Sequence, residues 1–152
     1  FFLDMNSGFQ RILEDCARPA RYPAGHYLFR QGQKAHRFHL LHTGRVSLEQ
    51  FVGGYGTLII ETLDPGDIVG ISWLFPPYRH QWDARCLEET RTLGFNAGCL
   101  REICEADHDL GYELMKRFSA AMIQRLQEAR LQCLDVYAKP PAARRQKTGP
   151  TR

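Results

Sequence analysis

Closely spaced glycines divide the middle of this 152-residue chain into short segments. Between Tyr22 and Phe95 the glycines recur roughly every eight to twelve residues, and the segments between them contain many β-branched and aromatic residues. Turns at this spacing are typical of short antiparallel strands in a sandwich or barrel. The pattern predicts eight strands, over 18–22, 26–30, 37–42, 45–52, 56–62, 67–70, 81–87 and 90–95.

The expected fold class is therefore mainly β with α. Eight short antiparallel strands predict a double-stranded β-helix, or jelly roll, flanked by helices. Ahead of the strands, residues 4–17 place apolar side chains at helical spacing, and Asn6 or Ser7 is available as the N-cap of a short helix.

Two further helices are expected after the strands. Asn96 is placed to cap a helix over 97–105, and Asp107 is placed to cap a helix of about 107–137. The last helix would be about 45 Å long, which is too long for a small barrel to cover. We therefore expect one effector domain over 1–138 whose final helix extends beyond the barrel.

The apolar residues of the long helix fall into two sets. Leu110, Leu114 and Ala121 are expected to face the barrel. Seven others form a stripe about 80° wide, the narrow seam of a helix that pairs with another helix. We expect a homodimer through this seam, and the alternative is that both sets are core within one monomer. The predicted dimer interface is Met115, Phe118, Met122, Leu126, Ala129, Cys133 and Val136.

Residues 139–152 form a basic tail that contains prolines and is expected to be disordered. Five of the 20 basic residues lie in this tail, which has no acidic residue, so the remainder carries 15 basic and 17 acidic residues, a net charge of −2. A domain with this balance has no overall attraction for a phosphate backbone. We expect no direct DNA binding by this chain.

The cysteines and the apolar runs indicate the compartment. Five scattered cysteines without a CxxC pair argue against a disulfide framework and a structural zinc site. The longest apolar runs are far shorter than the roughly 20 residues that span a bilayer, and no export signal is recognisable. We expect a cytoplasmic protein without a membrane segment.

Several short motifs, in order, give the chain a family resemblance over residues 8–137. It resembles the cyclic-nucleotide-binding domain of the CRP/FNR regulator superfamily, in a stand-alone form without the helix-turn-helix domain. The motifs are Tyr22-Pro23 ahead of Leu28, Gln31-Gly32-Gln33-Lys34-Ala35, Gly44-Arg45-Val46, Pro65-Gly66-Asp67-Ile68-Val69-Gly70 and Leu74-Phe75.

The resemblance implies a phosphate-binding cassette at Gly70, which is predicted to open a single helical turn. Free N–H groups at a helix start suit an anion such as a cyclic phosphate. In nucleotide-binding members a Glu follows this glycine, but this chain has Ile71. The family's later Arg-Ser/Thr-Ala triplet is replaced by either His80-Gln81-Trp82 or Trp82-Asp83-Ala84. Ordinary cyclic AMP binding is not expected.

The cassette is expected to bind another small anionic effector, such as a carboxylate or an aromatic acid stacked on Trp73 or Trp82. Arg79 or Arg85 would supply the charge, unless Asp83 and Arg85, which share a strand face, neutralise each other. An empty or collapsed site and an unusual mode of nucleotide binding are the alternatives. The expected effector site is lined by Ile60, Gly70, Ile71, Ser72, Arg79, His80, Trp82 and Arg85.

Three functional hypotheses follow. The first is a sensor for signalling, in which the effector repositions the long helix. The second is a ligand-free dimeric interaction module that recruits a partner protein. The third is the cyclic-nucleotide-binding half of a transcription regulator, because only fifteen residues follow Tyr137 and these cannot supply a winged helix-turn-helix.

Metal and redox sites are weakly supported. His39 and His42 are three apart on one strand and project to opposite faces, whereas His36 and His42 lie about 20 Å apart. This pattern does not favour a cupin-type metal enzyme. Cys99 and Cys104 are five apart on a short helix, which separates them by about 140° and does not favour iron–sulfur ligation.

Catalysis is likewise not expected. The chain has no GxSxG motif, and Asp107-His108-Asp109 is most simply a helix cap. His80 is the candidate haem ligand, and only its position in a loop supports this role. We predict that the chain is not an enzyme and assign it no cofactor.

Overall fold

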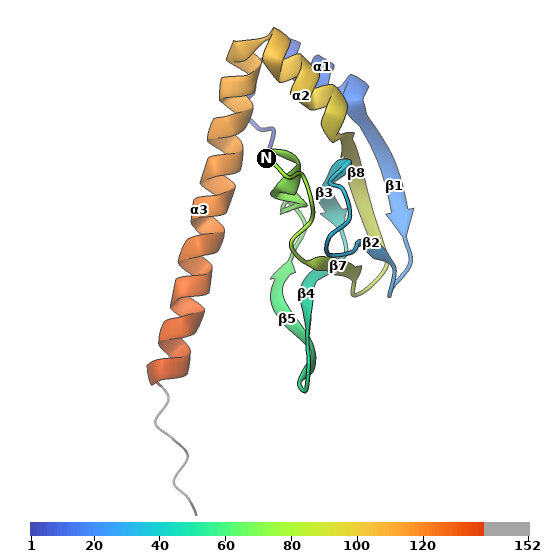
Figure 1. The fold of residues 1–152 in the computed structure, drawn as a ribbon. Coiled ribbons are helices and arrows are strands. Elements are labelled where there is room, and N and C mark those ends of the chain that lie inside the picture. Colours follow the sequence, from blue (N-terminus) through green and yellow to red (C-terminus); the bar gives the residue numbers. More distant parts are fainter. Residues whose placement is uncertain (139–152) are drawn as a thin grey trace, which may run out of the picture. The chain divides into compact units, whose positions relative to one another are not determined.

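The computed structural model describes residues 1–138, and our predictions for the tail over 139–152 lie outside this range (Figure 1). The elements are α1 (Ser7–Cys16), β1 (Ala17–Tyr22), β2 (Tyr27–Phe29), β3 (Arg37–Thr43), β4 (Val46–Val52), β5 (Gly56–Leu63), β6 (Ile68–Val69), the 3₁₀ helix η1 (Ile71–Trp73), β7 (Asp83–Cys86), β8 (Thr90–Asn96), α2 (Ala97–Ala106) and α3 (His108–Ala138). The eight predicted strands and the flanking helices are confirmed.

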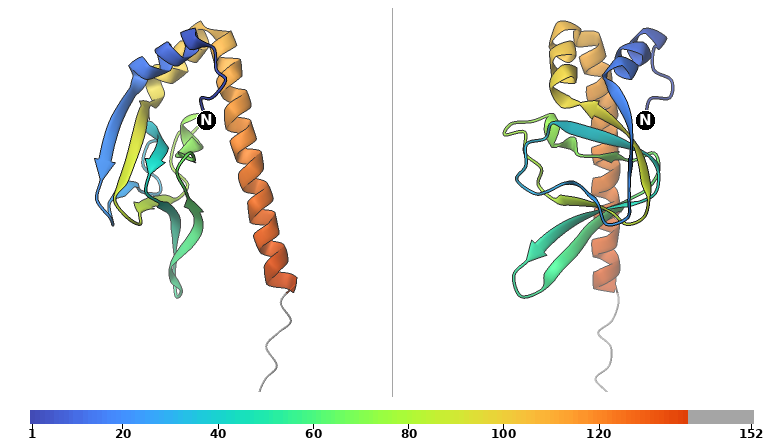
Figure 2. Two further views of the ribbon diagram at one scale, coloured as in Figure 1. Left: turned by 180° about the vertical axis from the view of Figure 1, so that it is seen from behind. Right: turned by 90° about the vertical axis from the view of Figure 1, so that its right-hand side faces the viewer.

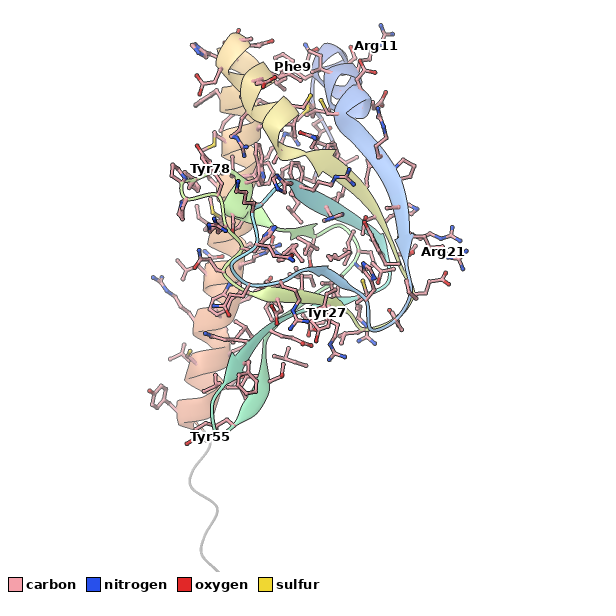
Figure 3. All side chains as sticks on the ribbon, turned by 45° about the vertical axis from the view of Figure 1, so that its right-hand side comes forward. Phe9, Arg11, Arg21, Tyr27, Tyr55 and Tyr78 are labelled. Carbon is pink, nitrogen blue, oxygen red and sulfur yellow. The ribbon has the colours of Figure 1, made fainter. Side chains whose placement is uncertain are left out.

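The strands form two antiparallel four-stranded sheets (Figure 2). Sheet A has the order β1-β8-β3-β6, and sheet B has the order β2-β7-β4-β5. Apart from the β4–β5 hairpin, neighbours in each sheet come from distant parts of the sequence, as in a jelly roll. The β4–β5 hairpin carries Tyr55 at its tip (Figure 3), and 82% of the surface of Tyr55 is exposed.

An apolar core fills the space between the two sheets. In sheet B, Val46 pairs with Cys86 and Leu48 pairs with Ala84. Because strand residues alternate between faces, these four side chains point to the same side. They join a buried cluster completed by Phe29, Leu41, Leu63 and Val69.

A second core lies on the opposite face of sheet A, where the helices cover it. Phe38 stacks on Phe95 and on Trp73, with ring centroids 4.8 and 5.1 Å apart. Leu110 and Leu114 of α3 are buried in this cluster, as predicted.

Phe118 is also part of this second core. Its ring lies 5.2 Å from that of Phe38 and is fully buried. The prediction that Phe118 belongs to the dimer seam is therefore wrong for this structure, because the first turns of α3 use that position to close the core of the monomer.

Short polar side chains begin the helices as predicted. Asn6 accepts from the amide of Gly8, and Asn96 accepts from the amide of Cys99. Asp107 accepts from the amide of Leu110 at the start of α3. Each bond pairs one of the amides that a helix start leaves without an internal partner.

The part of α3 after Ala121 forms a unit of its own. Several of its large apolar side chains are exposed, including Ile123, Leu126, Leu131, Leu134 and Tyr137. Ala129 and Cys133 of the predicted seam are also exposed, whereas Met122 is half-buried and the side chain of Val136 lies outside the described part. Within residues 1–138, no helix is long and apolar enough to cross a membrane.

Candidate functional site

The predicted cassette is present as a turn followed by η1. Gly66 has a φ of +96°, as its turn requires, and Gly70 has a φ of +91°. A left-handed glycine at this point lets the chain leave β6 and enter η1 directly. The first amides of η1 have no partner within the turn, which is the feature that favours an anion.

Two of the protein's own rings pack against Gly70. The rings of Phe29 and His80 are stacked, with centroids 3.5 Å apart. A Cβ atom placed on Gly70 would lie 3.1 Å from Cε1 of Phe29 and 3.3 Å from Cε1 of His80. The space beside the cassette glycine is therefore occupied by side chains of β2 and of the loop before β7.

His80 is held in this position as a neutral ring. Only 4% of its surface is exposed, and its Nδ1 has no hydrogen-bond partner among the described residues. Burial, with a smaller effect from nearby His36, lowers the pKa of His80 to about 4. It therefore brings no positive charge to the cassette at neutral pH, and its stacked ring is not presented to a haem.

Trp82 and Asp83 have structural contacts of their own. Trp82 is half-buried and packs against the core between the sheets. The Asp83 carboxylate accepts from the amide of Gln31 at 2.7 Å and lies 3.3 Å from Nε of Arg30. In the Trp82-Asp83-Ala84 alternative the triplet thus offers an apolar ring and an anion, and in the His80-Gln81-Trp82 alternative it begins with the neutral ring of His80.

Arg85 lies on the face of sheet B opposite the apolar core. In the ladder between β4 and β7 it pairs with Ser47, and both alternate with the core residues Leu48 and Ala84. Its guanidinium contacts the Glu49 carboxylate through Nη2 at 2.7 Å and Nε at 2.9 Å. Asp83 and Arg85 share this face as predicted, but each pairs with another residue.

Glu49 is the buried member of this pair, with 1% of its surface exposed. Burial raises the pKa of Glu49, but hydrogen bonds from Arg85 and from the Ser47 hydroxyl, at 2.6 Å, outweigh burial and hold it below its ordinary value. Arg85 therefore pairs with Glu49 on the face opposite the apolar core, and its place in the effector site stays a prediction.

The remaining predicted site residues do not complete an anion site. Arg79 donates from Nη1 to the Gly32 carbonyl at 2.7 Å. Ile71 packs against the second core, which contains Phe38 and Trp73, and Ser72 is half-buried on η1. Ile60 lies on the edge strand β5, with 42% of its surface exposed.

Several positions of the cassette depart from the family's nucleotide-binding pattern. Ile71 has no acceptor for a ribose hydroxyl, and the rings of Phe29 and His80 occupy the space beside Gly70. A phosphate there would meet no unengaged guanidinium from Arg79 or Arg85.

Sequence reasoning missed Phe29 and Glu49. Phe29 gave no signal, because an aromatic residue in a strand is ordinary core. Glu49 follows Leu48 in an apolar strand, and an acidic residue at such a position indicates a buried partner. That partner was not identifiable without the register between β4 and β7.

Comparison with known proteins identifies the family. Residues 19–107 match the cyclic nucleotide-binding domain family, which is more than half of the chain. The chain belongs to this family of regulatory domains. A comparison with the curated protein sequences finds no match.

Solved structures share the fold. A Geobacter metallireducens GS-15 protein assigned to cyclic nucleotide binding is 29% identical, with a TM-score of 0.74 over 82% of this chain and 90% of its own. A cyclic nucleotide-binding domain from Methylobacillus flagellatus KT is 17% identical, with a TM-score of 0.79 over 94% and 79%. The Thermus thermophilus catabolite activator protein is 22% identical, with a TM-score of 0.67 over 90% and 62%.

Metal binding has no support in the part of the chain that the structure describes. No group of three or more His, Cys, Asp or Glu side chains there is arranged to hold a metal ion. Cys99 lies against Cys16 instead, with their sulfur atoms 2.9 Å apart, in a contact between α1 and α2.

Proposed function

We propose that this chain is a CRP/FNR-like regulatory domain that does not take a cyclic nucleotide in its cassette. Family membership supports the regulatory role. The packing of Phe29 and His80 against Gly70 is the observation that carries the rest of the proposal, because a group that approaches Gly70 from its Cβ side meets both rings.

The output of such a domain is proposed to pass through α3. A row of exposed apolar side chains on this helix favours pairing with a second copy, since isolated helices rarely leave such a row uncovered. We infer a cytoplasmic, non-enzymatic homodimer that acts on a partner protein. Its seam excludes Phe118 and includes Met115 and Leu126, which are 37% and 51% exposed.

A sedimentation experiment tests the dimer. Leu126→Glu introduces like charges at the seam and is expected to shift the protein from dimer to monomer. Gln127→Glu lies about 100° further round the helix and serves as the matched control that leaves the dimer intact. If both variants sediment alike, the seam does not hold a dimer, and helix pairing is no longer part of the proposal.

Thermal unfolding against a ligand panel tests the cassette. A ligand at 100 times its Kd stabilises a protein by about 2.7 kcal/mol, which is a rise of roughly 5–10 °C in Tm for a domain of this size. The panel includes cyclic AMP, cyclic GMP and cyclic di-GMP, because a similar fold from Xanthomonas campestris is described as a c-di-GMP responsive regulator. We expect no shift with any of them.

Small carboxylates form the second arm of this panel, because they represent the effector predicted from the sequence. A shift that is lost in Arg79→Ala would support the sensor hypothesis, in which the cassette binds a small anionic effector and not a cyclic nucleotide. Arg79 is chosen because it pairs with a backbone carbonyl, that of Gly32, whereas Arg85 pairs with a carboxylate.

A further inference from the structure

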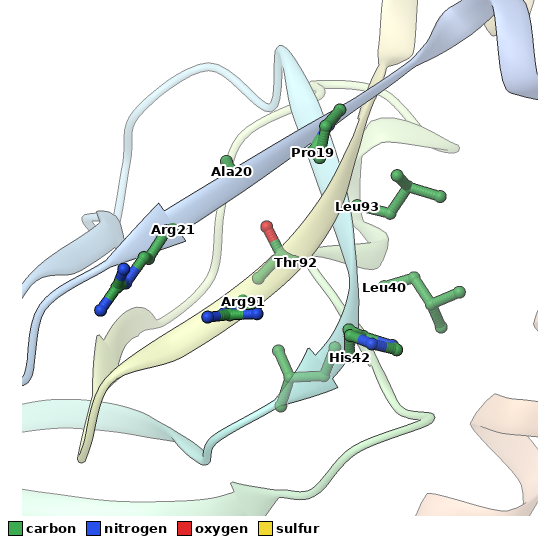
Figure 4. Close-up of a pocket in the computed structure, with 9 residues that line it drawn as sticks. Pro19, Ala20, Arg21, Leu40, His42, Arg91, Thr92 and Leu93 are labelled. Atoms are coloured by element: carbon green, nitrogen blue, oxygen red, sulfur yellow. The ribbon is translucent and has the colours of Figure 1, made fainter.

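Helix residues pack on Phe38 and Phe95 at one end of the face of sheet A that points away from sheet B, which we call its outer face. Further along the strands, Pro19, Leu93 and Leu40 lie side by side, because Leu93 of β8 pairs with Pro19 of β1 and with Leu40 of β3. They line a cavity of about 580 Å³ (Figure 4). In this close-up, the side chains of Leu40 and Leu93 project to the same side of the sheet.

A second cavity adjoins this one. Its volume is about 370 Å³, and it is also lined by Leu40 and Leu93, together with Phe2, Leu13 and Phe95. The two cavities share these two side chains and therefore adjoin, and we call them together the outer groove. Between Arg91 and Phe95, four residues along β8, it extends about 13 Å.

One end of the outer groove is positively charged. Arg21 of β1 and Arg91 of β8 are directly opposite each other in the ladder, and both line the groove (Figure 4). Like charges at such a pair repel. The Glu89 carboxylate contacts Arg21 at 2.5 Å, so one anion faces two guanidinium groups. His42 lines the same end.

We propose that the outer groove binds a medium-chain monocarboxylate. The carboxylate accepts from Arg91 and relieves its repulsion with Arg21, while the alkyl chain lies on Pro19, Leu93 and Leu40. An extended alkyl chain advances about 1.25 Å per carbon, so a groove of about 13 Å holds a chain of about ten carbons. This site is separate from the cassette and does not depend on the function proposed above.

Isothermal titration with decanoate tests this site on the full chain. Decan-1-ol tests the need for the charge, and shorter carboxylates test the need for the apolar groove. Each methylene removed is expected to weaken binding by about two- to fourfold, the upper value corresponding to full burial at about 0.8 kcal/mol per methylene. Decan-1-ol is expected to bind at least tenfold more weakly than decanoate.

Two variants locate the site. Arg91→Gln is expected to weaken decanoate binding about tenfold, as for a lost hydrogen bond to a charged group at the surface. Arg45→Gln is the matched control, because Arg45 also lies at an exposed strand end beside a carboxylate, that of Glu88, but does not line the groove. Leu93→Phe fills the groove with an apolar side chain and is expected to weaken binding at least as much.

Three results would overturn the proposal: no binding of decanoate, equal binding of decan-1-ol, or equal loss in Arg91→Gln and Arg45→Gln. A second copy of the chain that covers the groove would give two results together. The wild type would not bind decanoate, and Leu93→Glu would change the sedimentation of the protein. These outcomes are independent of the cyclic nucleotide panel, so failure here leaves the account of the cassette in place.

Discussion

Replacing Arg85 by methionine tests whether its guanidinium is committed to Glu49 or available to a ligand. The variant keeps the aliphatic length of the side chain and removes the contacts at 2.7 and 2.9 Å. Glu49, 1% exposed, then becomes a buried carboxylate with the Ser47 hydroxyl as its remaining close donor.

The expected loss follows from the burial of the two partners. Removing one partner of a fully buried ion pair costs about 3–5 kcal/mol. Arg85 is 36% exposed, so water can replace part of its interaction with Glu49. We therefore expect a loss of about 2 kcal/mol in the free energy of unfolding at neutral pH, or roughly 4–8 °C in Tm.

The loss is expected to depend on pH. The pKa of Glu49 is lowered in the folded state, so its pairing stabilises the protein above the pKa of the unfolded chain and is lost as pH falls through the folded value. Burial without Arg85 raises the pKa of Glu49 in the variant. The difference between the unfolding free energies of wild type and Arg85→Met should therefore shrink as pH falls and vanish below the lowered pKa of Glu49 in the wild type.

Urea denaturation followed by circular dichroism at a series of pH values provides the measurement. Arg45→Met is the matched control, because Arg45 pairs with Glu88 at 3.5 Å with both side chains about half exposed, and it should cost less than about 0.5 kcal/mol. A loss for Arg85→Met as small as that for the control, and equal at every pH, would mean that Arg85 is free to serve a ligand.

Two further predictions concern the backbone and a buried histidine. Gly44→Ala should lower the free energy of unfolding by about 3–5 kcal/mol, because Gly44 has a φ of +87° and its new Cβ would lie 2.5 Å from the Glu89 carbonyl oxygen. Gly32→Ala should lower it by about 1–2 kcal/mol in the same urea assay, because Gly32 has a φ of +83° but open space around it. Because the pKa of His80 is lowered to about 4 from 6.5, its contribution to stability is complete above pH 6.5 and is lost as pH falls toward 4. His80→Phe should flatten the decline of the unfolding free energy over that range by up to about 3 kcal/mol, and an unchanged pH profile would contradict the burial of His80.

The fold was predictable because its determinants are local. Glycines mark the turns, and capping side chains such as Asn96 and Asp107 mark the helix starts. The left-handed Gly70 and the one-turn η1 also follow from the short motif around them. These features depend on neighbours in the sequence, so a single chain reveals them.

The site was less predictable because its determinants are pairings between distant strands. Arg85 was expected at the cassette from its distance along the chain, but the register of β7 on β4 directs it to Glu49 on the opposite face. The stack of Phe29 on His80 joins residues 51 positions apart. Phe118 fits the helical seam by angle, yet the core of the monomer already uses it.

Titration of cyclic AMP into the wild-type protein by isothermal calorimetry tests the central claim most directly. The packing of Phe29 and His80 against Gly70 predicts no measurable heat of binding, even at millimolar nucleotide. Saturable binding at one site per chain with micromolar affinity, abolished by Gly70→Val, would contradict the claim that the protein's own rings occupy the cassette.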